Sequence, residues 1–414
     1  MSVSSETAVG GLGRAALEAL LARQGEGSID AATRFDALAR FEELPVRSAL
    51  RGGRNWKHDL EKLDLSGVAT FDDARASAPL PALPPAAASA GVTIERFSLA
   101  RNRHRDAFER RFGRAVDTRD DKFASLALAF ADDGVFIDVP PGVILEQPLV
   151  IDYVAGAAAL FPYTLVALGA GSKASVFERL RTLDGAPLFC GIAELLLDER
   201  AELTYTIDQR AGQTTRLLMT RRATLGADAQ LHVACAELGG LHAVSRLRAT
   251  ALGPGGRVET VALFFSGGSQ HVDIETETVH AAGNTQSATI VRSAGTGRGQ
   301  GRYLGNIKIL AQAHGADASL RDDALLLSKG AHIDSVPALE IAANDVRAFH
   351  GATIGAISEE ELFYAQTRGI ARADAERMIA LGFFEPALSR FPTEALRAEL
   401  RVVLEAKLAP PSSA

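Results

Sequence analysis

Four segments at a regular spacing decide the fold of this chain: LGAGSKASV (168–176), LDERAELTY (197–205), LGADAQLHV (225–233) and LGPGGRVET (252–260). Each begins with a leucine, continues through a polar or glycine-containing turn, and ends in a run that alternates like a β-strand. The leucines are 29, 28 and 27 residues apart. Self-similarity at such a period is typical of a solenoid, in which each repeat packs on its neighbours.

The same pattern continues towards the C-terminus and narrows the kind of solenoid. VHAAGNTQS (279–287) and LAQAHGADA (310–318) keep the spacing, and LSKGAHIDS (327–335) is interpreted as another turn of the same type. A propeller blade needs about 40–45 residues, and a leucine-rich repeat needs an LxxLxL ladder that this sequence lacks. The alternation also excludes helical repeats. The pattern therefore predicts a mainly β chain built around a parallel β-helix, with several short strands per coil and coils stacked about 4.8 Å apart.

Composition divides the chain into four parts. Residues 1–85 are expected to form a helical domain, because Ala, Leu and Phe recur at three- and four-residue intervals over 8–50, before a linker rich in Pro and Ala. Residues 86–133 form a transition segment, and residues 134–356 carry the β-helix. Residues 357–414 return to a helical pattern.

Three helices are expected in this C-terminal part. Ser358 and Glu361 match a capping box that begins the first helix, and Gly369 ends it. The second helix covers 371–381 and is closed by Gly382.

The third helix is capped by Thr393 and has one apolar stripe: Leu396, Leu400, Val403, Leu404 and Leu408. This stripe packs either on the chain's own strands or on a partner, and the sequence leaves both alternatives open.

Composition also restricts the classes of function. The 414-residue chain has a net charge of −7, which argues against a nucleic-acid-binding surface, since such surfaces are basic. No apolar run approaches the ~18–20 residues of a membrane helix, and the N-terminus lacks the basic start and apolar block of a secretory signal. Cys190 and Cys235 are expected to be small buried hydrophobes, and a cytoplasmic location is expected.

Two other segments carry polar or glycine-rich patterns. After His271, acidic residues alternate at Asp273, Glu275 and Glu277. Alternate residues share one face of a strand. We expect this acidic face to be exposed to solvent. The alternative is that its carboxylates form a strip that attracts a metal ion. The glycine-rich segment 294–305 lacks the GxxxxGK[ST] pattern of a phosphate loop, so no ATPase activity is expected of this chain.

The end of the strand region contains the main candidate functional residue, His350. The last coil of a solenoid exposes unpaired N–H and C=O groups, which helical caps or the added strands of a partner must cover. From the residues alone, His350 is either a polar residue on a strand face or a ligand group, and both interpretations stay open.

The segment LLLSKGAHIDSVPALEIAANDVRAFHGATIGAISEEELFYAQTRGI (325–370) resembles the C-terminal core of the SufB/SufD family, the scaffold subunits of the SUF iron–sulfur cluster assembly machine. The resemblance rests on the SKG-A turn, P-x-LEI, the N-D-V strand, HGAT-x-G, the acidic E-E-x-LFY helix and RGI. TVHAAGNTQS (278–287) and R-x-W-K-H-D-L-x-KL (54–63) extend it over nearly the whole chain.

This resemblance implies a right-handed parallel β-helix flanked by helical N- and C-terminal domains. It implies a non-catalytic scaffold that pairs with a SufB subunit, docks the SufC ATPase, and shares a transient iron–sulfur cluster with its partner. Some members of this system are associated with reduced FAD, but the sequence assigns no flavin site. The implied SufC-docking region contains Leu362, Phe363, Tyr364, Arg368, Phe383 and Phe384.

Motif positions within the resemblance imply the SufD type. SufB-type subunits carry an essential cysteine in the strand before the SKG turn, whereas 319–327 contains none and has Arg321 about where it would be. SufD-type subunits offer the histidine of HGAT, here His350, as a candidate iron ligand beside the partner's cysteine. Some SufD chains add a cysteine two residues earlier, where this chain has Ala348.

Two other functions remain alternatives. The chain is a homodimeric β-helix adaptor that uses its open edge on a second copy, or it is a β-helix enzyme that acts on polysaccharide. The enzyme would need carboxylates clustered in a groove and usually export, and the lack of a signal sequence argues against it.

Overall fold

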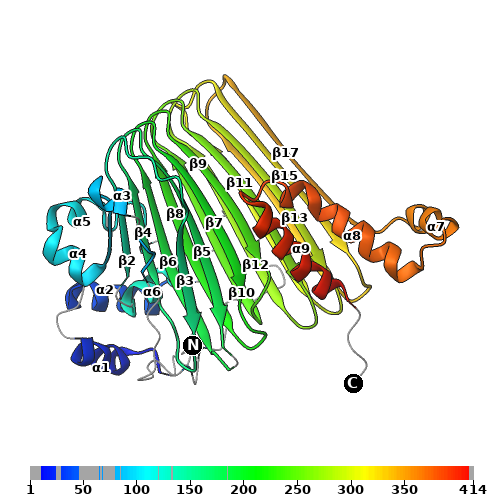
Figure 1. Ribbon diagram of the computed structural model, residues 1–414, viewed down its shortest axis with the longest axis horizontal. Coiled ribbons are helices and arrows are strands. Elements are labelled where there is room, and N and C mark those ends of the chain that lie inside the picture. The colour runs from blue at the N-terminus through cyan, green and yellow to red at the C-terminus, as the bar shows by residue number, and fades with distance from the viewer. Residues whose placement is uncertain are drawn as a thin grey trace, which may run out of the picture.

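The computed structural model describes residues 11–24, 29–45, 65, 68, 80–83, 85–119, 121–131, 134–183 and 185–409. Its centre is a stack of parallel coils, which confirms the predicted β-helix (Figure 1).

The described strands form one sheet of nine strands and one of eight. In order, the nine-stranded sheet contains β1 (Thr93–Arg96), β2 (Val135–Val139), β4 (Tyr163–Leu168), β6 (Leu188–Leu197), β8 (Arg216–Leu225), β10 (His242–Ala251), β12 (His271–His280), β14 (Gln300–Ile309) and β16 (His332–Ile341). The eight-stranded sheet contains β3 (Leu149–Ala155), β5 (Lys173–Thr182), β7 (Glu202–Arg210), β9 (Gln230–Glu237), β11 (Arg257–Ser266), β13 (Gln286–Gly295), β15 (Ala316–Leu326) and β17 (Val346–Ala356).

Each full coil contributes one long strand to each sheet. The prediction of several short strands per coil is wrong, because β6, β8 and β10 each contain 10 residues. The chain turns only at the two edges where the sheets meet, and the alternating pattern runs unbroken between those edges. Apolar side chains from both sheets, such as Val258 and Ile274, meet in the interior and form the main core.

The repeated leucine turns lead from the nine-stranded sheet into the eight-stranded sheet. Within them Gly171 has a φ of 66° and Asp228 a φ of 54°. This left-handed region favours Gly, Asn and Asp, which explains the polar and glycine residues of the repeat. Successive turns stack because the amide of Asp198 donates to the carbonyl of Leu168 over 2.9 Å.

The turn after Leu327 does not belong to this series. It leads from β15 to β16, back into the nine-stranded sheet, and therefore lies at the opposite edge of the solenoid. The amide of Leu327 donates to the carbonyl of Gly295 (2.8 Å), one coil earlier at that edge. Its interpretation as a turn of the same type is wrong, because both edges use glycine and polar residues and local sequence does not distinguish them.

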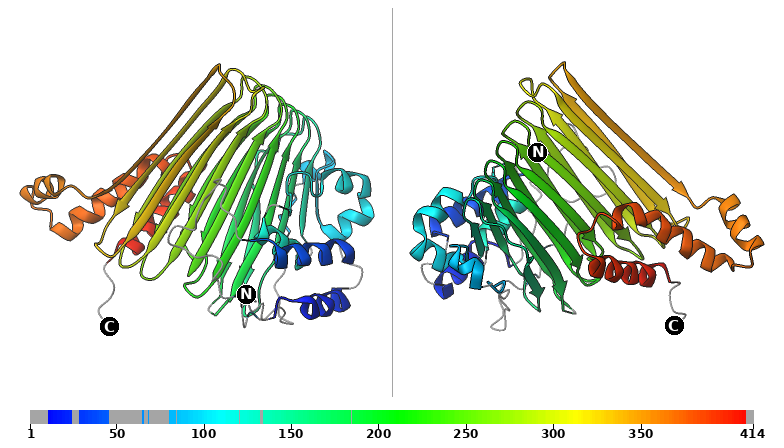
Figure 2. Two further views of the ribbon diagram at one scale, coloured as in Figure 1. Left: turned by 180° about the vertical axis from the view of Figure 1, so that it is seen from behind. Right: turned by 45° about the horizontal axis from the view of Figure 1, so that its top comes forward.

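Helices lie against the N-terminal end of the solenoid (Figure 2). Strand β1 pairs antiparallel with β2 and so completes the edge of the nine-stranded sheet at this end. Phe123 of α6 shares a buried cluster with Phe136 and Phe161 of the first coils. The helices are α1 (Arg14–Gln24), α2 (Ala31–Glu43), α3 (Pro85–Ser89), α4 (Phe97–Arg103), α5 (Arg105–Arg111) and α6 (Lys122–Ala129), and the first two confirm helix within the predicted 8–50.

Three helices follow the last strand: α7 (Glu359–Thr367), α8 (Arg372–Leu388) and α9 (Glu394–Leu408). The apolar stripe of α9 packs on the outer face of the eight-stranded sheet, where Leu400 and Leu404 share a cluster with Leu263 of β11. Of the two alternatives for this stripe, packing on the chain's own strands is therefore confirmed.

The ends of these helices agree only in part with the predicted caps. The hydroxyl of Thr393 accepts a bond from the amide of Leu396 (3.3 Å), which confirms the cap of α9. Ser358 stands at the cap of α7 but makes no side-chain capping bond, and Gly369 with a φ of 83° follows the helix. Gly382 does not end a helix: α8 continues to Leu388, because the buried face of its last turns outweighs the cost of about 1 kcal/mol for one glycine.

Candidate functional site

The C-terminal end of the solenoid is open. β16 is the last strand of the nine-stranded sheet and β17 the last of the eight-stranded sheet, so each has one edge without a strand partner among the described elements. In Figures 1 and 2, β17 forms the outer boundary of the solenoid, while α8 and α9 lie over other strands. Ile341, Phe349 and Ile354 are 45%, 59% and 43% exposed at this end. An open edge with apolar side chains is suited to adding the strands of another chain.

His350 lies in the middle of this open edge. It stands on β17 opposite Leu320 of β15, a residue of the interior core, so its side chain is on the inner face of the sheet. The side chain is half-buried, and its Nδ1 atom is buried without a hydrogen-bond partner in the described part of the chain. A neutral imidazole with an unused nitrogen is a common metal ligand.

Two other histidines of the strand region, His332 and His280, are hydrogen-bonded within the chain. His332 begins β16, and its Nε2 lies 2.8 Å from the carboxylate of Asp334. His280 is fully buried, with Nδ1 2.7 Å from the hydroxyl of Thr285 and Nε2 2.9 Å from that of Ser287. Burial lowers the pKa of His280 to about 4. These contacts give His280 a packed role inside the chain.

The acidic strip of β12 is buried, so the prediction of a solvated face is wrong. Asp273, Glu275 and Glu277 are only 3%, 4% and 7% exposed. Burial raises the pKa of Glu275 to about 7, with the Asp273 carboxylate adding to the effect and Arg246 opposing it. Within the described residues, no group of three His, Cys, Asp or Glu side chains is arranged to hold a metal ion.

Arginines on the neighbouring strands explain how these carboxylates are accommodated. Arg302 of β14 stands in register with Asp273 and is ion-paired with it. Arg246 of β10 stands in register with Glu275, and its Nε lies 3.2 Å from that carboxylate. These partners come from strands one coil away, and the spacing along β12 alone gives no signal of them.

The implied docking residues divide into a buried and an exposed group. Leu362 is 1% exposed and Phe384 is 0% exposed, so both side chains serve the packing of this chain. Phe383 is half-buried, and the guanidinium of Arg292 lies 5.3 Å from its ring centroid. Leu362 and Phe384 are therefore not available to contact a partner directly.

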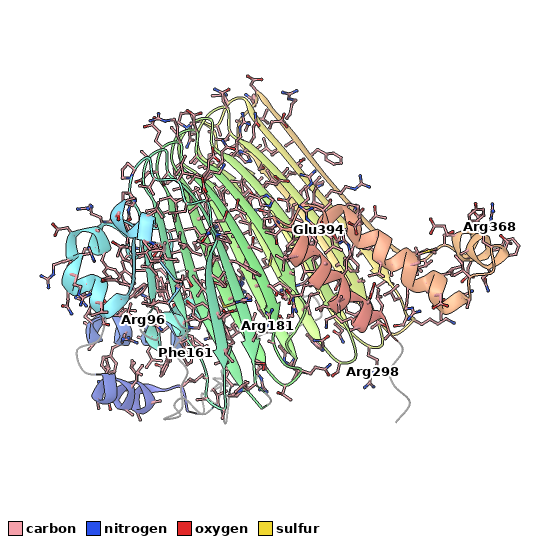
Figure 3. All side chains as sticks on the ribbon, viewed as in Figure 1. Arg96, Phe161, Arg181, Arg298, Arg368 and Glu394 are labelled. Carbon is pink, nitrogen blue, oxygen red and sulfur yellow. The ribbon has the colours of Figure 1, made fainter. Side chains whose placement is uncertain are left out.

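The exposed group lies on α7, which projects away from the solenoid (Figure 1). Phe363 and Tyr364 are 69% and 63% exposed. Arg368, labelled in Figure 3, places its guanidinium 5.2 Å from the ring centroid of Tyr364. Met378 of α8, which the sequence did not single out, is also 52% exposed. Together, Phe363, Tyr364, Arg368 and Met378 form what we call the arm surface.

Both cysteines are buried away from this end, as expected. Burial raises the pKa of Cys190 and of Cys235 well above the ordinary value for a thiol. The Cys190 thiol lies 3.6 Å from the carbonyl of Phe123, and the Cys235 thiol lies 3.3 Å from the carboxylate of Glu237. Neither is placed to act as a thiolate ligand beside His350.

Comparison with known proteins shows the family to which this chain belongs. Residues 151–383 match the family described as SUF system FeS cluster assembly, SufBD core domain, and residues 43–151 match the SufBD protein N-terminal region. The chain belongs to the SufBD family. The motif at 54–63, part of the sequence resemblance, falls in the N-terminal match but outside the described residues.

Several SufBD family proteins of staphylococci are similar to this chain. Iron–sulfur cluster assembly SufBD family proteins of Staphylococcus haemolyticus and Staphylococcus epidermidis are each 27% identical to it over 308 residues. One from Staphylococcus aureus is 26% identical over the same length. Each alignment covers 73% of this chain and 66% of the relative, so the chain spans just under two thirds of these relatives.

The described helices were also compared with the length and apolar character of a membrane-spanning helix. None that the structure describes combines the length and the apolar character that crossing a bilayer requires.

Proposed function

We propose that this chain is the SufD-type scaffold subunit of a cytoplasmic SUF complex. Its open solenoid end pairs with a SufB-type subunit, and its arm surface docks a SufC ATPase. A nascent iron–sulfur cluster is built at the joint between the two scaffolds and is then passed on. The observation that carries the proposal is His350, with its unpartnered Nδ1, on the inner face of an exposed terminal strand.

The chemistry of His350 supports transfer of the cluster rather than its permanent storage. Thiolates bind iron tightly, whereas an imidazole is a weaker ligand whose binding depends on pH. A site formed by a partner's thiolate and His350 would hold a cluster and release it readily. This chain supplies no thiol there, because Ala348 precedes His350 on the same face and both cysteines are buried elsewhere.

The arm surface supports docking of an ATPase outside the solenoid. Phe363 and Tyr364 are aromatic anchors of the kind that dominate protein interfaces, and both are solvent-exposed. Catalysis of ATP hydrolysis belongs to the partner in this proposal. No described residue is assigned to a flavin.

The alternatives are less well supported. A polysaccharide-acting enzyme needs paired carboxylates open to a groove, whereas the carboxylates of β12 are buried and ion-paired with arginines. A homodimer would use the same open end as the heterodimer. It is therefore an outcome of the test below.

Co-purification and cluster formation test the proposal. The tagged full-length chain, passed over extract of its own cells, is expected to retain an ATPase and a larger sister scaffold. The variant His350→Ala should retain both partners but lower the activity of cluster-dependent enzymes in cells several-fold. His332→Ala, on the neighbouring edge strand, is the matched control and should leave that activity unchanged. Undiminished activity with His350→Ala, or recovery of only a second copy of this chain, would refute the proposal.

A further inference from the structure

A buried polar cluster lies just inside the open end, behind His350. The hydroxyl of Ser335 on β16 donates to Oδ2 of Asp322 on β15, so the two side chains meet across the interior of the last coil. The hydroxyl of Tyr303 on β14 lies 2.6 Å from that of Thr276. Burial raises the pKa of Tyr303, and the nearby Asp322 carboxylate adds to this effect.

Asp322 has one oxygen atom that the described part of the chain does not use. The residue is 0% exposed, and its Oδ1 is buried with no hydrogen-bond partner there. Burial raises the pKa of Asp322 to about 6. A buried carboxylate oxygen without a partner is unfavourable and rare in folded proteins. A cation entering the open end would satisfy it.

The strand register brings this oxygen close to His350. Leu320 stands opposite His350, and Asp322 stands opposite Ala352. Asp322 and His350 therefore point to the same inner face, on neighbouring strands and two residues out of register. The ladder spacings put their Cα atoms about 8 Å apart. A metal ion bound to both side chains needs ligand atoms only about 4 Å apart, which two side chains extending from one face can provide.

We propose that Asp322 and His350 together hold a single ferrous ion at the open end before sulfur reaches it. The inference rests on the proposed function, in which iron is the cargo. Imidazole and carboxylate are both suitable ligands for ferrous iron, and the remaining positions are filled by water and then by the partner's thiolate. Ser335 holds the other carboxylate oxygen and so fixes the direction in which Oδ1 points.

Metal binding by the isolated full-length chain tests this proposal directly. Under anaerobic conditions the chain is titrated with Co(II), whose visible absorption reports its ligands, and with Fe(II) in competition with a chelator. Asp322→Asn keeps the side-chain volume but removes the charge. Asp317→Asn is the control, because Asp317 lies on the same strand but is half-exposed and paired with Arg347 at 3.5 Å.

We expect His350→Ala and Asp322→Asn each to weaken Co(II) and Fe(II) binding at least tenfold, and Asp317→Asn to change it less than twofold. Asp322→Ala is a second variant in case the amide perturbs folding, which circular dichroism would reveal. Unchanged binding by a folded Asp322 variant would overturn the inference, as would the absence of binding by the wild-type chain.

The two assays, enzyme activity in cells and metal binding, distinguish a failure of the proposed function from a failure of this inference. If His350→Ala leaves cluster-dependent enzyme activity in cells unchanged, the assembly site itself is wrong, whatever the metal titration shows. If His350→Ala lowers both that activity and metal binding while the Asp322 variants bind normally, only the role of Asp322 is wrong.

Discussion

His280 makes the stability of the solenoid depend on pH in a defined window. Its ring is fully buried at the end of β12 and is bonded to the hydroxyls of Thr285 and Ser287, which hold the following turn. Burial lowers its pKa from 6.5 to about 4, so the folded chain keeps the ring neutral where the unfolded chain protonates it. The unfolded state therefore binds more protons between these two values, and stability rises with pH across them.

The size of this effect follows from the difference between the two pKa values. Each unit corresponds to about 1.4 kcal/mol, so a lowering from 6.5 to about 4 corresponds to about 3 kcal/mol. This contribution is fully present above pH 6.5 and is lost as the pH falls to about 4. The raised pKa of Glu275, about 7, and of Asp322, about 6, act with the opposite sign, because their folded forms bind protons first.

Urea unfolding of wild type and His280→Asn at several pH values isolates the contribution of His280 to the pH dependence of stability. The carboxyl groups of Glu275 and Asp322 are present in both proteins, so their contributions cancel in the difference. The stability difference between them should shrink by about 2–3 kcal/mol from pH 7 to pH 4.5. Gln286→Ala, an exposed change six residues later, is the control and should give a curve parallel to wild type. A difference between wild type and His280→Asn that stays constant over this range would refute the reasoning.

Three further changes test other parts of the structure. Arg302→Met leaves the buried Asp273 carboxylate without its ion-pair partner and should lower the free energy of unfolding by about 3–5 kcal/mol, as measured by chemical denaturation. The double variant Arg302→Met with Asp273→Asn should recover part of this loss. Leu400→Ala removes a fully buried side chain between α9 and the sheet and should cost about 2–5 kcal/mol in the same assay. Phe349→Asp adds a charge to the exposed strand at the open end, so it should abolish co-purification of the partner scaffold. The thermal midpoint of the chain itself should shift by less than 2 °C. An intact complex would contradict the proposed interface.

The sequence predicted the features that depend on neighbouring residues along the chain. The leucine repeat indicated a solenoid because each turn needs a residue such as Gly171 or Asp228 that tolerates positive φ, and that requirement is local. The cap at Thr393 was predictable for the same reason, since it involves only the amide of Leu396. The open last coil, too, follows from any solenoid that must end.

The helix boundaries show where local rules are insufficient. Gly382 is a reasonable end of a helix by composition, yet α8 continues through it because its last turns pack on the eight-stranded sheet. Leu362 and Phe384 match the motif of the docking region, yet both are buried in this chain. Burial against the distant eight-stranded sheet decides the end of α8 and the place of Phe384, whereas Leu362 is covered by Ala365 and Ala375 of α7 and α8. The motif itself contains no information about either kind of packing.

For this protein, sequence alone determined the repeat, the family resemblance and the identity of His350, because these are carried by residues within a few positions of one another. The tertiary structure alone decided that Asp273 meets Arg302, and that Asp322 shares the inner face of the open end with His350. The physical reason is the register. A period of two tells which residues share a face, but only the pairing of strands one coil apart tells which face is inside and which charges meet there.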